Sequence, residues 1–185
     1  MEHPLEQFHY CPKCGSPHFG EHNAKSKQCR DCGFTYYFNP SAATVAFILR
    51  QRKGGADAAP EEQELLVVRR AKEPARGTLD LPGGFSDTDE TSEEGVRREV
   101  REETGLEVEE TEFLFSLPNR YPYSDFTVHT IDMFYRCRVR DTEGGRAMDD
   151  AAELLWIPLR KVRPEEFGLG SIRRGVEKFL ASFSI

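Results

Sequence analysis

The 185-residue sequence has no apolar run long enough for a membrane-spanning helix, which needs about 18 to 20 consecutive apolar residues. It has no excess of positive charge either, because 25 lysines and arginines face 32 aspartates and glutamates, a net charge of −7. This balance argues against a general binder of nucleic acids or anionic membranes. The first residues, MEHPLEQFHY, lack the basic and apolar regions of a secretory signal. We therefore expect a cytoplasmic protein that has no membrane partner and is not built to bind nucleic acid.

Cysteine is scarce outside one short segment, since four of the five cysteines lie between residues 11 and 32. This clustering argues against a disulfide framework for the whole chain. From Ser41 onward, apolar runs alternate with turns marked by glycine and proline. The residue before a proline favours extended backbone, which places the boundary near Asn39-Pro40. We predict a small module over residues 1–39 and a larger domain over residues 40–185.

The larger domain shows strand and helix patterns in mixed order. The capping-box pair Thr91 and Glu94 predicts a helix start, and Gly105 lies where a helix-ending glycine is expected. Mixed strands with two helices favour an α/β sandwich around a mixed sheet. Apolar periodicity predicts strands at 44–49, 65–68, 113–117, 131–139 and 154–157, and helices at 92–103 and 171–183, with a polar turn at 50–62.

Two C-x2-C pairs, Cys11 with Cys14 and Cys29 with Cys32, stand fourteen residues apart. Two such turns can bring four thiolates into a tetrahedron around Zn²⁺, and a site filled by four protein ligands is structural. Disulfides or redox-active thiols are the alternatives. We expect the nearby residues His9, His18 and His22 to be exposed and not to bind the metal. Cys137, on the apolar side of a predicted strand, is expected to be a core residue.

Three glutamates crowd one face of the predicted helix over residues 92–103. Glu99, Glu102 and Glu103 are related by spacings of three and four, so their charges repel by a few tenths of a kcal/mol per pair. A hard divalent cation turns this repulsion into attraction, and Mg²⁺ is usually held by carboxylates, water and substrate phosphate. Gly95, one turn earlier on this face, leaves room for a metal or for packing.

The segment from Gly84 to Leu106 resembles the Nudix box, G-x5-E-x7-R-E-U-x-E-E-x-G-U, where U is aliphatic. The preceding Leu81-Pro82-Gly83-Gly84-Phe85 is also typical of Nudix hydrolases. All fixed positions match: Gly84, Glu90, Arg98, Glu99, Val100, Glu102, Glu103, Gly105 and Leu106.

This resemblance implies a Nudix α/β/α sandwich that hydrolyses a nucleoside diphosphate linked to another moiety with Mg²⁺ or Mn²⁺. It also implies that Glu99, Glu102 and Glu103 bind the metal, that Arg98 orients a glutamate, and that Glu90 is structural. The general base varies in this family between a box glutamate and an acid in a later loop. Asp149, Asp150 and Glu153 precede a predicted strand at about the place of that loop acid.

A cysteine module ahead of a Nudix domain resembles NADH pyrophosphatases and related FAD or ADP-ribose hydrolases, some of which form dimers. Their further signature, S-Q-P-W-P-F-P-x-S, is half kept between Ser116 and Ser124, where Leu117 and Asn119 replace Gln and Trp. The resemblance therefore implies an adenine-containing substrate and the release of AMP, without a strong preference for nicotinamide. Candidate substrate contacts are Arg70, Arg120, Tyr121 and Tyr123, the tyrosines by stacking on a base.

Two other functions fit parts of the sequence. One is a nucleoside triphosphate sanitiser or an RNA 5′-cap pyrophosphohydrolase, which the cysteine module favours because zinc ribbons can bind nucleic acid. The other is a ligand-sensing regulator with a nucleic-acid-binding ribbon. The intact box and the net charge of −7 argue against the regulator, which does not need all three glutamates.

Overall fold

The computed structural model describes residues 4–51, 63–123 and 125–183. Its contacts group Met1–Pro40 with Tyr121–His129 in a first unit, and Ser41–Arg120 with Thr130–Ile185 in a second. Each unit is described here by itself. The division into domains 1–39 and 40–185 stays a prediction, and most of the predicted polar turn lies outside the described residues.

The first unit contains a small antiparallel sheet in the order β1-β2-β3. Its strands are β1 (Phe19–Asn23), β2 (Ser26–Cys29) and β3 (Thr35–Tyr37), preceded by the short helix η1 (Pro4–Gln7). Its apolar core is small, because the buried cluster contains only Cys11, Phe19 and Cys29 among the described residues. So small a core gives little stability, which is typical of modules that depend on a metal.

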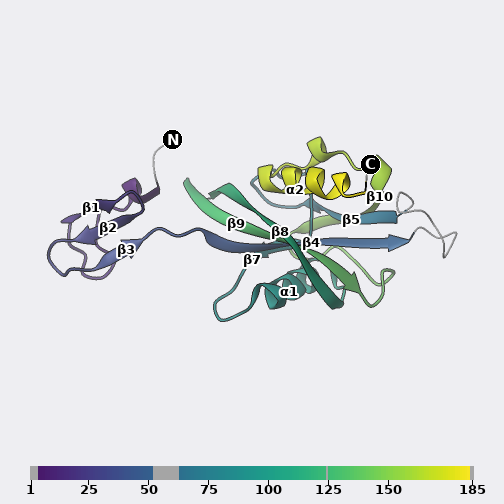
Figure 1. Ribbon diagram of the computed structural model, residues 1–185, viewed down its shortest axis with the longest axis horizontal. Coiled ribbons are helices and arrows are strands. Elements are labelled where there is room, and N and C mark those ends of the chain that lie inside the picture. The colour runs from purple at the N-terminus through teal and green to yellow at the C-terminus, as the bar shows by residue number, and fades with distance from the viewer. Residues whose placement is uncertain (1–3, 52–62, 124, 184–185) are drawn as a thin grey trace. The chain divides into compact units, whose positions relative to one another are not determined.

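The second unit is built on a mixed seven-stranded sheet (Figure 1). Five of its strands lie in the order β10-β5-β4-β9-β8, and the two short strands β6 and β7 pair with β5 and β4. The strands predicted at 44–49 and 65–68 lie within β4 and β5, which pair antiparallel. The long central strand β4 also pairs parallel with β9, so the sheet is mixed as predicted. The strands are β4 (Ser41–Gln51), β5 (Gln63–Arg70), β6 (Leu79–Asp80), β7 (Gly83–Phe85), β8 (Val108–Tyr123), β9 (Phe126–Val139) and β10 (Ala151–Pro158).

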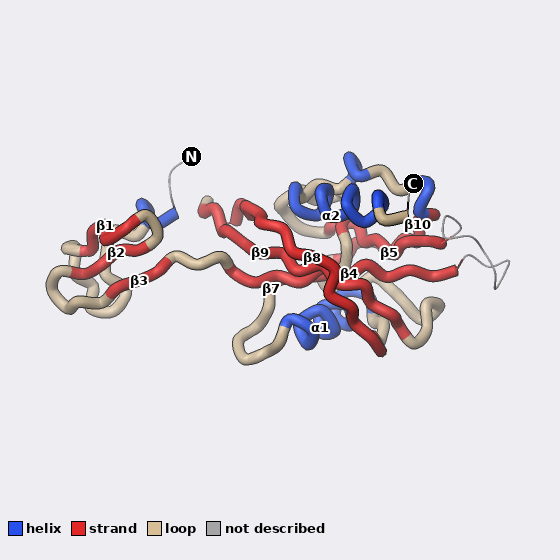
Figure 2. Tube along the Cα trace, viewed as in Figure 1, coloured by secondary structure: helices blue, strands red, loops and turns tan. Residues whose placement is uncertain are grey.

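Two helices cover the two faces of this sheet, α1 (Ser92–Thr104) on one and α2 (Gly170–Ala181) on the other (Figures 1 and 2). Val96 and Val100 of α1 are fully buried against alternate residues of the strands. The apolar stripe of α2 packs against the other set, including Phe47 and Phe134. Two short helices, η3 (Leu159–Lys161) and η4 (Pro164–Glu166), lead from β10 to α2. The predicted α/β/α sandwich is confirmed.

One segment differs from its expectation. The strand predicted at 113–117 is observed as part of β8, which begins at Val108 and continues as far as Tyr123. Pro118 and Pro122 interrupt the apolar pattern that predicts strands, and proline is tolerated in a strand at the end of a sheet, where β8 lies. Among the described residues, no helix is long and apolar enough to cross a membrane.

Candidate functional site

Local sequence signals fix the helix that carries the box glutamates. The Thr91 hydroxyl accepts a hydrogen bond from the Glu94 amide, and the Glu94 carboxylate accepts one from the Thr91 amide, so the predicted capping box is present. Gly105 ends the helix with a φ of 70°, in the left-handed region that favours glycine. The buried side chains of Val96 and Val100 face the sheet and so fix the rotation of α1 about its axis. The box glutamates of α1 and Arg98 therefore lie along one side of the helix.

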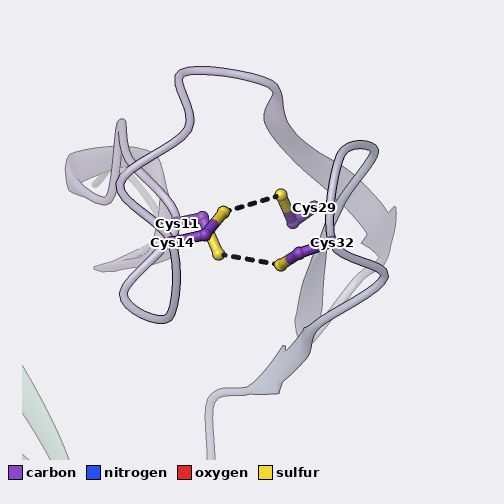
Figure 3. Close-up of side chains that lie close together, drawn as sticks. All are labelled: Cys11, Cys14, Cys29 and Cys32. Carbon is purple, nitrogen blue, oxygen red and sulfur yellow. Dashed lines mark hydrogen bonds between the residues drawn. The ribbon is translucent and has the colours of Figure 1, made fainter.

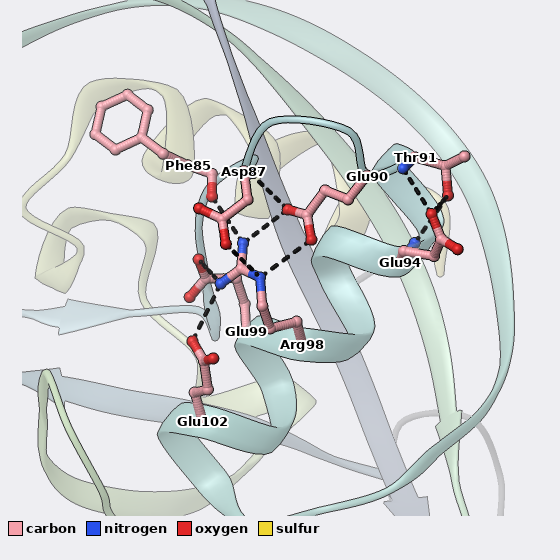
Figure 4. Close-up of polar contacts among 8 residues, drawn as sticks. All are labelled: Phe85, Asp87, Glu90, Thr91, Glu94, Arg98, Glu99 and Glu102. Atoms are coloured by element: carbon pink, nitrogen blue, oxygen red, sulfur yellow. Dashed lines mark hydrogen bonds and ion pairs between the residues drawn. The ribbon is translucent and has the colours of Figure 1, made fainter.

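Arg98 lies at the centre of a carboxylate cluster (Figure 4). Its Nε and Nη2 donate to the two oxygens of Glu90, at 3.1 and 2.8 Å. Its Nη1 donates to Glu99 at 2.9 Å and to Glu102 at 3.1 Å. Nη2 also donates to the carbonyl oxygen of Phe85 at 3.0 Å, which ties the helix to β7. One guanidinium thus orients three glutamates, and the hydrogen bonds from Arg98 lower the pKa of Glu90.

Two glycines allow this close packing. A Cβ atom on Gly84 would lie 2.5 Å from a carboxylate oxygen of Glu99, so only glycine lets β7 approach that side chain. A Cβ atom on Gly95 would lie 2.9 Å from a carboxylate oxygen of Glu90. Of the two predicted uses of Gly95, the structure therefore shows packing against the Glu90–Arg98 pair.

Glu103 is the most buried of the three box glutamates, with only 8% of its surface exposed. Its carboxylate accepts a hydrogen bond from the Gly83 amide at 3.1 Å. Burial is the largest cause that raises its pKa to about 9, and the nearby carboxylates of Asp80, Glu99 and Asp150 contribute to this value. Burial also raises the pKa of Glu99. A buried group of carboxylates is unfavourable without a cation, and its hard oxygen donors fit Mg²⁺ or Mn²⁺.

The two candidate acids lie in different surroundings, Asp150 in the loop before β10 and Glu153 within β10. The loop before β10 is joined to α1, because the Met148 amide donates to the Glu103 carbonyl oxygen at 2.9 Å. Asp150 lies close enough to Glu103 to affect its pKa and forms an ion pair with Lys72. Glu153 instead pairs with Arg69 at 2.9 Å. Leu154 packs on the α1 side of the sheet, and strand alternation therefore places Glu153 on the α2 side.

The structure describes the four candidate substrate contacts to different extents. Arg70 donates to the buried Asp80 carboxylate at 2.5 Å and to the Pro74 carbonyl oxygen at 2.7 Å, so its guanidinium is engaged within the fold. Arg120 is exposed and belongs to the second unit, whereas Tyr121 belongs to the first. The side chain of Tyr123 lies outside the described structure. Their contacts with a substrate stay predictions.

Two residues near the site were not predicted from the sequence. Asp80 is buried and lies close enough to Glu103 to affect its pKa, which the sequence could not show because β6 is far from α1 along the chain. Phe85 is 43% exposed, and its ring points away from the Arg98 guanidinium that its carbonyl group contacts (Figure 4). The position of Phe85 directly after Gly84 could have predicted a ligand contact, because an exposed aromatic ring beside a charged site can contact a ligand.

The four cysteines of the first unit converge at one point (Figure 3). Their sulfur atoms all lie within 4.8 Å of one another. The sulfurs of Cys11 and Cys32 are 3.7 Å apart, and those of Cys14 and Cys29 are 3.6 Å apart. A tetrahedral Zn²⁺ site with bonds of about 2.3 Å has sulfurs about 3.8 Å apart, so the spacing fits a zinc ion.

The surroundings of the cysteines favour thiolate at one position. Burial raises the pKa of Cys29, but hydrogen bonds from the backbone amides of Cys32 and Asp31 outweigh this effect and lower the value to about 6. The Ser16 amide lowers the pKa of Cys14, yet sharing protons with the other thiols raises it to about 12. One thiolate therefore makes the next harder to form unless a cation is present. Outside this cluster, Cys137 is buried in the second unit, as predicted.

Comparison with protein families matches residues 41–178 to the NUDIX domain. The chain is 32% identical over 133 residues to the ADP-ribose pyrophosphatase of Methanocaldococcus jannaschii, covering 70% of this chain and 68% of that protein. It is 31% identical over 115 residues to the NAD-capped RNA hydrolase NudC of Deinococcus radiodurans. That match covers 62% of this chain but only 38% of the Deinococcus protein.

Solved structures share the fold at low identity. A NUDIX hydrolase from Nitrosomonas europaea superposes with a TM-score of 0.65 at 19% identity, covering 94% of this chain and 90% of that one. The NUDIX domain of Shewanella oneidensis NrtR, solved with ADP ribose, gives a TM-score of 0.60 at 18% identity, covering 98% and 99%.

Proposed function

This chain belongs to the Nudix hydrolase family, and on that premise we propose that it cleaves the diphosphate bond of an ADP-ribose-like or NADH-like substrate and releases AMP. The observation that carries the proposal is the cluster around Arg98, which orients Glu90, Glu99 and Glu102 on one rim of α1 beside the buried Glu103. The carboxylates of Glu99, Glu102 and Glu103 extend from one side of α1, where we infer that a diphosphate and its cations are bound.

In the proposed mechanism, Glu99, Glu102 and Glu103 bind the Mg²⁺ or Mn²⁺ ions. When bound, these ions supply charge neutralisation for the diphosphate and a more acidic water molecule. Arg98 orients Glu99 and Glu102 through its hydrogen bonds. Glu90 has a structural role, because it accepts two hydrogen bonds from Arg98 and so positions the guanidinium. The chain's own acids then accept the proton of the attacking water.

We assign this base to Asp150 rather than to Glu153. Asp150 lies near Glu103, on a loop that is hydrogen-bonded to the end of α1. Glu153 lies on the other side of the sheet and is paired with Arg69. We therefore expect Asp150→Asn to lower kcat much more than Glu153→Gln.

The adenine-containing substrate is supported by the relatives and by one exposed ring. The ADP-ribose pyrophosphatase of Methanocaldococcus jannaschii and the NAD-capped RNA hydrolase of Deinococcus radiodurans are both named for substrates with an ADP-ribosyl or NAD group. Phe85 offers an exposed face next to the cluster, suited to stacking on a base. Stacking is worth about 1 to 3 kcal/mol per base. We therefore expect Phe85→Ala, and Tyr121→Ala if that ring also stacks, to raise KM for the substrate.

The alternative with specific support is removal of a nucleotide cap from RNA, because the Deinococcus relative is an NAD-capped RNA hydrolase.

We further propose that Cys11, Cys14, Cys29 and Cys32 bind a structural zinc ion, since their sulfur spacing fits one. The sanitiser and the ligand-sensing regulator stay alternatives without a structural observation of their own. With the proposed substrate, the protein acts on a small molecule. The homodimer and the location in the cytoplasm stay predictions.

The metal role of the glutamates is tested with Glu102→Gln and Glu103→Gln. Each replacement removes a negative ligand while keeping the shape, so we expect hydrolysis to fall by at least about 10²-fold with the fold retained. Glu107→Gln is the matched control, because Glu107 is exposed just after the box and pairs only with Arg101 among the contacts shown. Turnover near that of the wild type in both box variants would place the metal elsewhere.

The substrate class is tested by comparing kcat/KM for ADP-ribose, NADH, NAD, FAD, a capped RNA and deoxynucleoside triphosphates. AMP as a product of ADP-ribose or NADH supports the proposal, with little difference between the two. Pyrophosphate released from triphosphates, or a clear preference for the capped RNA, would overturn the substrate while leaving the site unchanged. No hydrolysis of any compound would favour the ligand-sensing regulator.

A further inference from the structure

The tip of the β8–β9 hairpin is grouped with the cysteine module. Residues Tyr121–His129 share the first unit with Met1–Pro40, although the remainder of both strands, Val108–Arg120 of β8 and Thr130–Val139 of β9, belongs to the second unit. A hairpin tip is ordinarily held by its own turn, which gives little stability. Here its contacts come from the module that contains the cysteines.

Aromatic rings form these contacts. The ring of Phe126, at the start of β9, stacks on that of Phe8, with centroids 5.7 Å apart and an angle of 12° between the planes. Phe126 also meets Phe38 edge-on at 6.1 Å, and His129 meets Phe38 edge-on at 5.5 Å. The Gln7 side chain donates a weak hydrogen bond to the Asp125 carbonyl oxygen at 3.4 Å. Such ring pairs contribute about 0.5 to 1.5 kcal/mol each beyond the area they bury.

The partner rings on the module side are positioned by the cysteine turns. Phe8 lies three residues before Cys11, and it packs with Tyr36 against the buried cluster that contains Cys11 and Cys29. Phe38 directly follows β3, and its amide donates to the Lys25 carbonyl oxygen at 2.9 Å. These rings therefore hold their positions only while the module is folded, and its small core makes that folding depend on the metal.

We propose that the aromatic cluster of Phe8, Tyr36, Phe38, Phe126 and His129 couples metal binding by the cysteines to the conformation of the hairpin tip. With the metal bound, the module presents the rings that fix Phe126. Without it, the rings separate and the tip loses its contacts. The tip carries Tyr121, so this coupling, if the proposed function is right, makes one substrate contact depend on an ion that takes no part in the reaction.

Hydrogen–deuterium exchange on the full-length chain tests the coupling without any substrate. Exchange is compared between the zinc-loaded protein and the protein treated with a zinc chelator. We expect amides at 121–129 to exchange at least ~10-fold faster after zinc removal, which corresponds to about 1.4 kcal/mol of lost protection. Amides of α1 are the internal reference and are expected to stay unchanged. Equal protection of the tip in both states would overturn the proposal.

Phe126→Ala separates the coupling from folding of the module. We expect this variant to keep its zinc and the protection of β1 and β2, while the tip exchanges fast even with zinc bound. Tyr37→Ala is the matched control, because Tyr37 is an exposed ring of β3 that lies outside the cluster. Phe38→Ala repeats the test from the module side. A tip that stays protected in Phe126→Ala and Phe38→Ala would contradict the proposal, and neither result depends on which substrate the enzyme cleaves.

Discussion

Both units bring acidic side chains close together, thiols in the first and carboxylates in the second, but the two units are stabilised in different ways. The first unit places four cysteine sulfurs within 4.8 Å of one another, and its buried apolar cluster contains, among the described residues, Cys11, Phe19 and Cys29. The second places several carboxylates beside Arg98, but α1 is anchored by valines that are fully buried in a much larger core. On the proposed assignments, the metal site of the first unit would stabilise its fold, whereas the metal site of the second unit would be supported by a fold that its own apolar core stabilises.

The largest expected difference follows from removing the zinc ion. With Cys29→Ser, or after chelation, we expect the first unit to unfold completely, because its apolar core cannot replace the metal. Two-dimensional ¹H–¹⁵N spectra should lose the dispersed signals of β1 to β3 and keep those of the second unit. Cys137→Ala is the mirrored control, since this buried cysteine lies in the second unit and its loss should leave the zinc content intact. Protein purified without chelator that contains no zinc would contradict the comparison.

The opposite experiment weakens the apolar core of the second unit. Phe47 is fully buried, and its ring stacks on that of Phe179 with centroids 3.9 Å apart. Phe47→Ala should therefore cost about 3 to 5 kcal/mol of unfolding free energy. Urea unfolding followed by the fluorescence of Trp156, which lies in β10, measures it. Zinc content should not change, and a loss below about 1 kcal/mol would show that the core relaxes around the cavity.

A smaller effect concerns the carboxylates of the second unit without added divalent cations. The pKa of Glu103 is raised to about 9 in the folded protein from an ordinary value of 4.5. Between these values the unfolded state releases the proton first, so stability falls as the pH rises, by about 1 kcal/mol or more between pH 6 and pH 8. Thermal unfolding of the wild type and of Glu103→Gln measures it, because the variant lacks this dependence. Added Mg²⁺ should restore stability only to the wild type, and parallel pH profiles would contradict the raised pKa.

The parts of the fold that are specified by neighbouring residues in the chain could be predicted from the sequence. The helix predicted at 92–103 is observed at 92–104, because its start and end are both specified by nearby residues, Thr91 and Gly105. The box glutamates could be placed on one face of α1 from their spacing alone. Their anchoring could not, because the approach of Gly84 to Glu99 depends on β7 pairing with β4, a contact distant in the chain.

Other features depended on contacts that no local pattern contains. Arg70 was expected near the substrate because it ends a strand, but the pairing of β5 with β6 brings the buried Asp80 to its guanidinium. Glu153 and Asp150 looked equivalent in sequence, and only strand alternation around the sheet separates them. The attachment of Phe126 to the cysteine module joins residues more than a hundred positions apart, a distance over which apolar periodicity carries no information.

The place of β8 at the end of the sheet bears on how the protein behaves at high concentration. A long terminal strand offers backbone N–H and C=O groups to strands of other chains, which is a common route to aggregation. Pro118 and Pro122 each remove one N–H donor from this strand and so limit such pairing. The two prolines therefore limit strand pairing between copies independently of any contact that residues 116–122 make with a nucleotide.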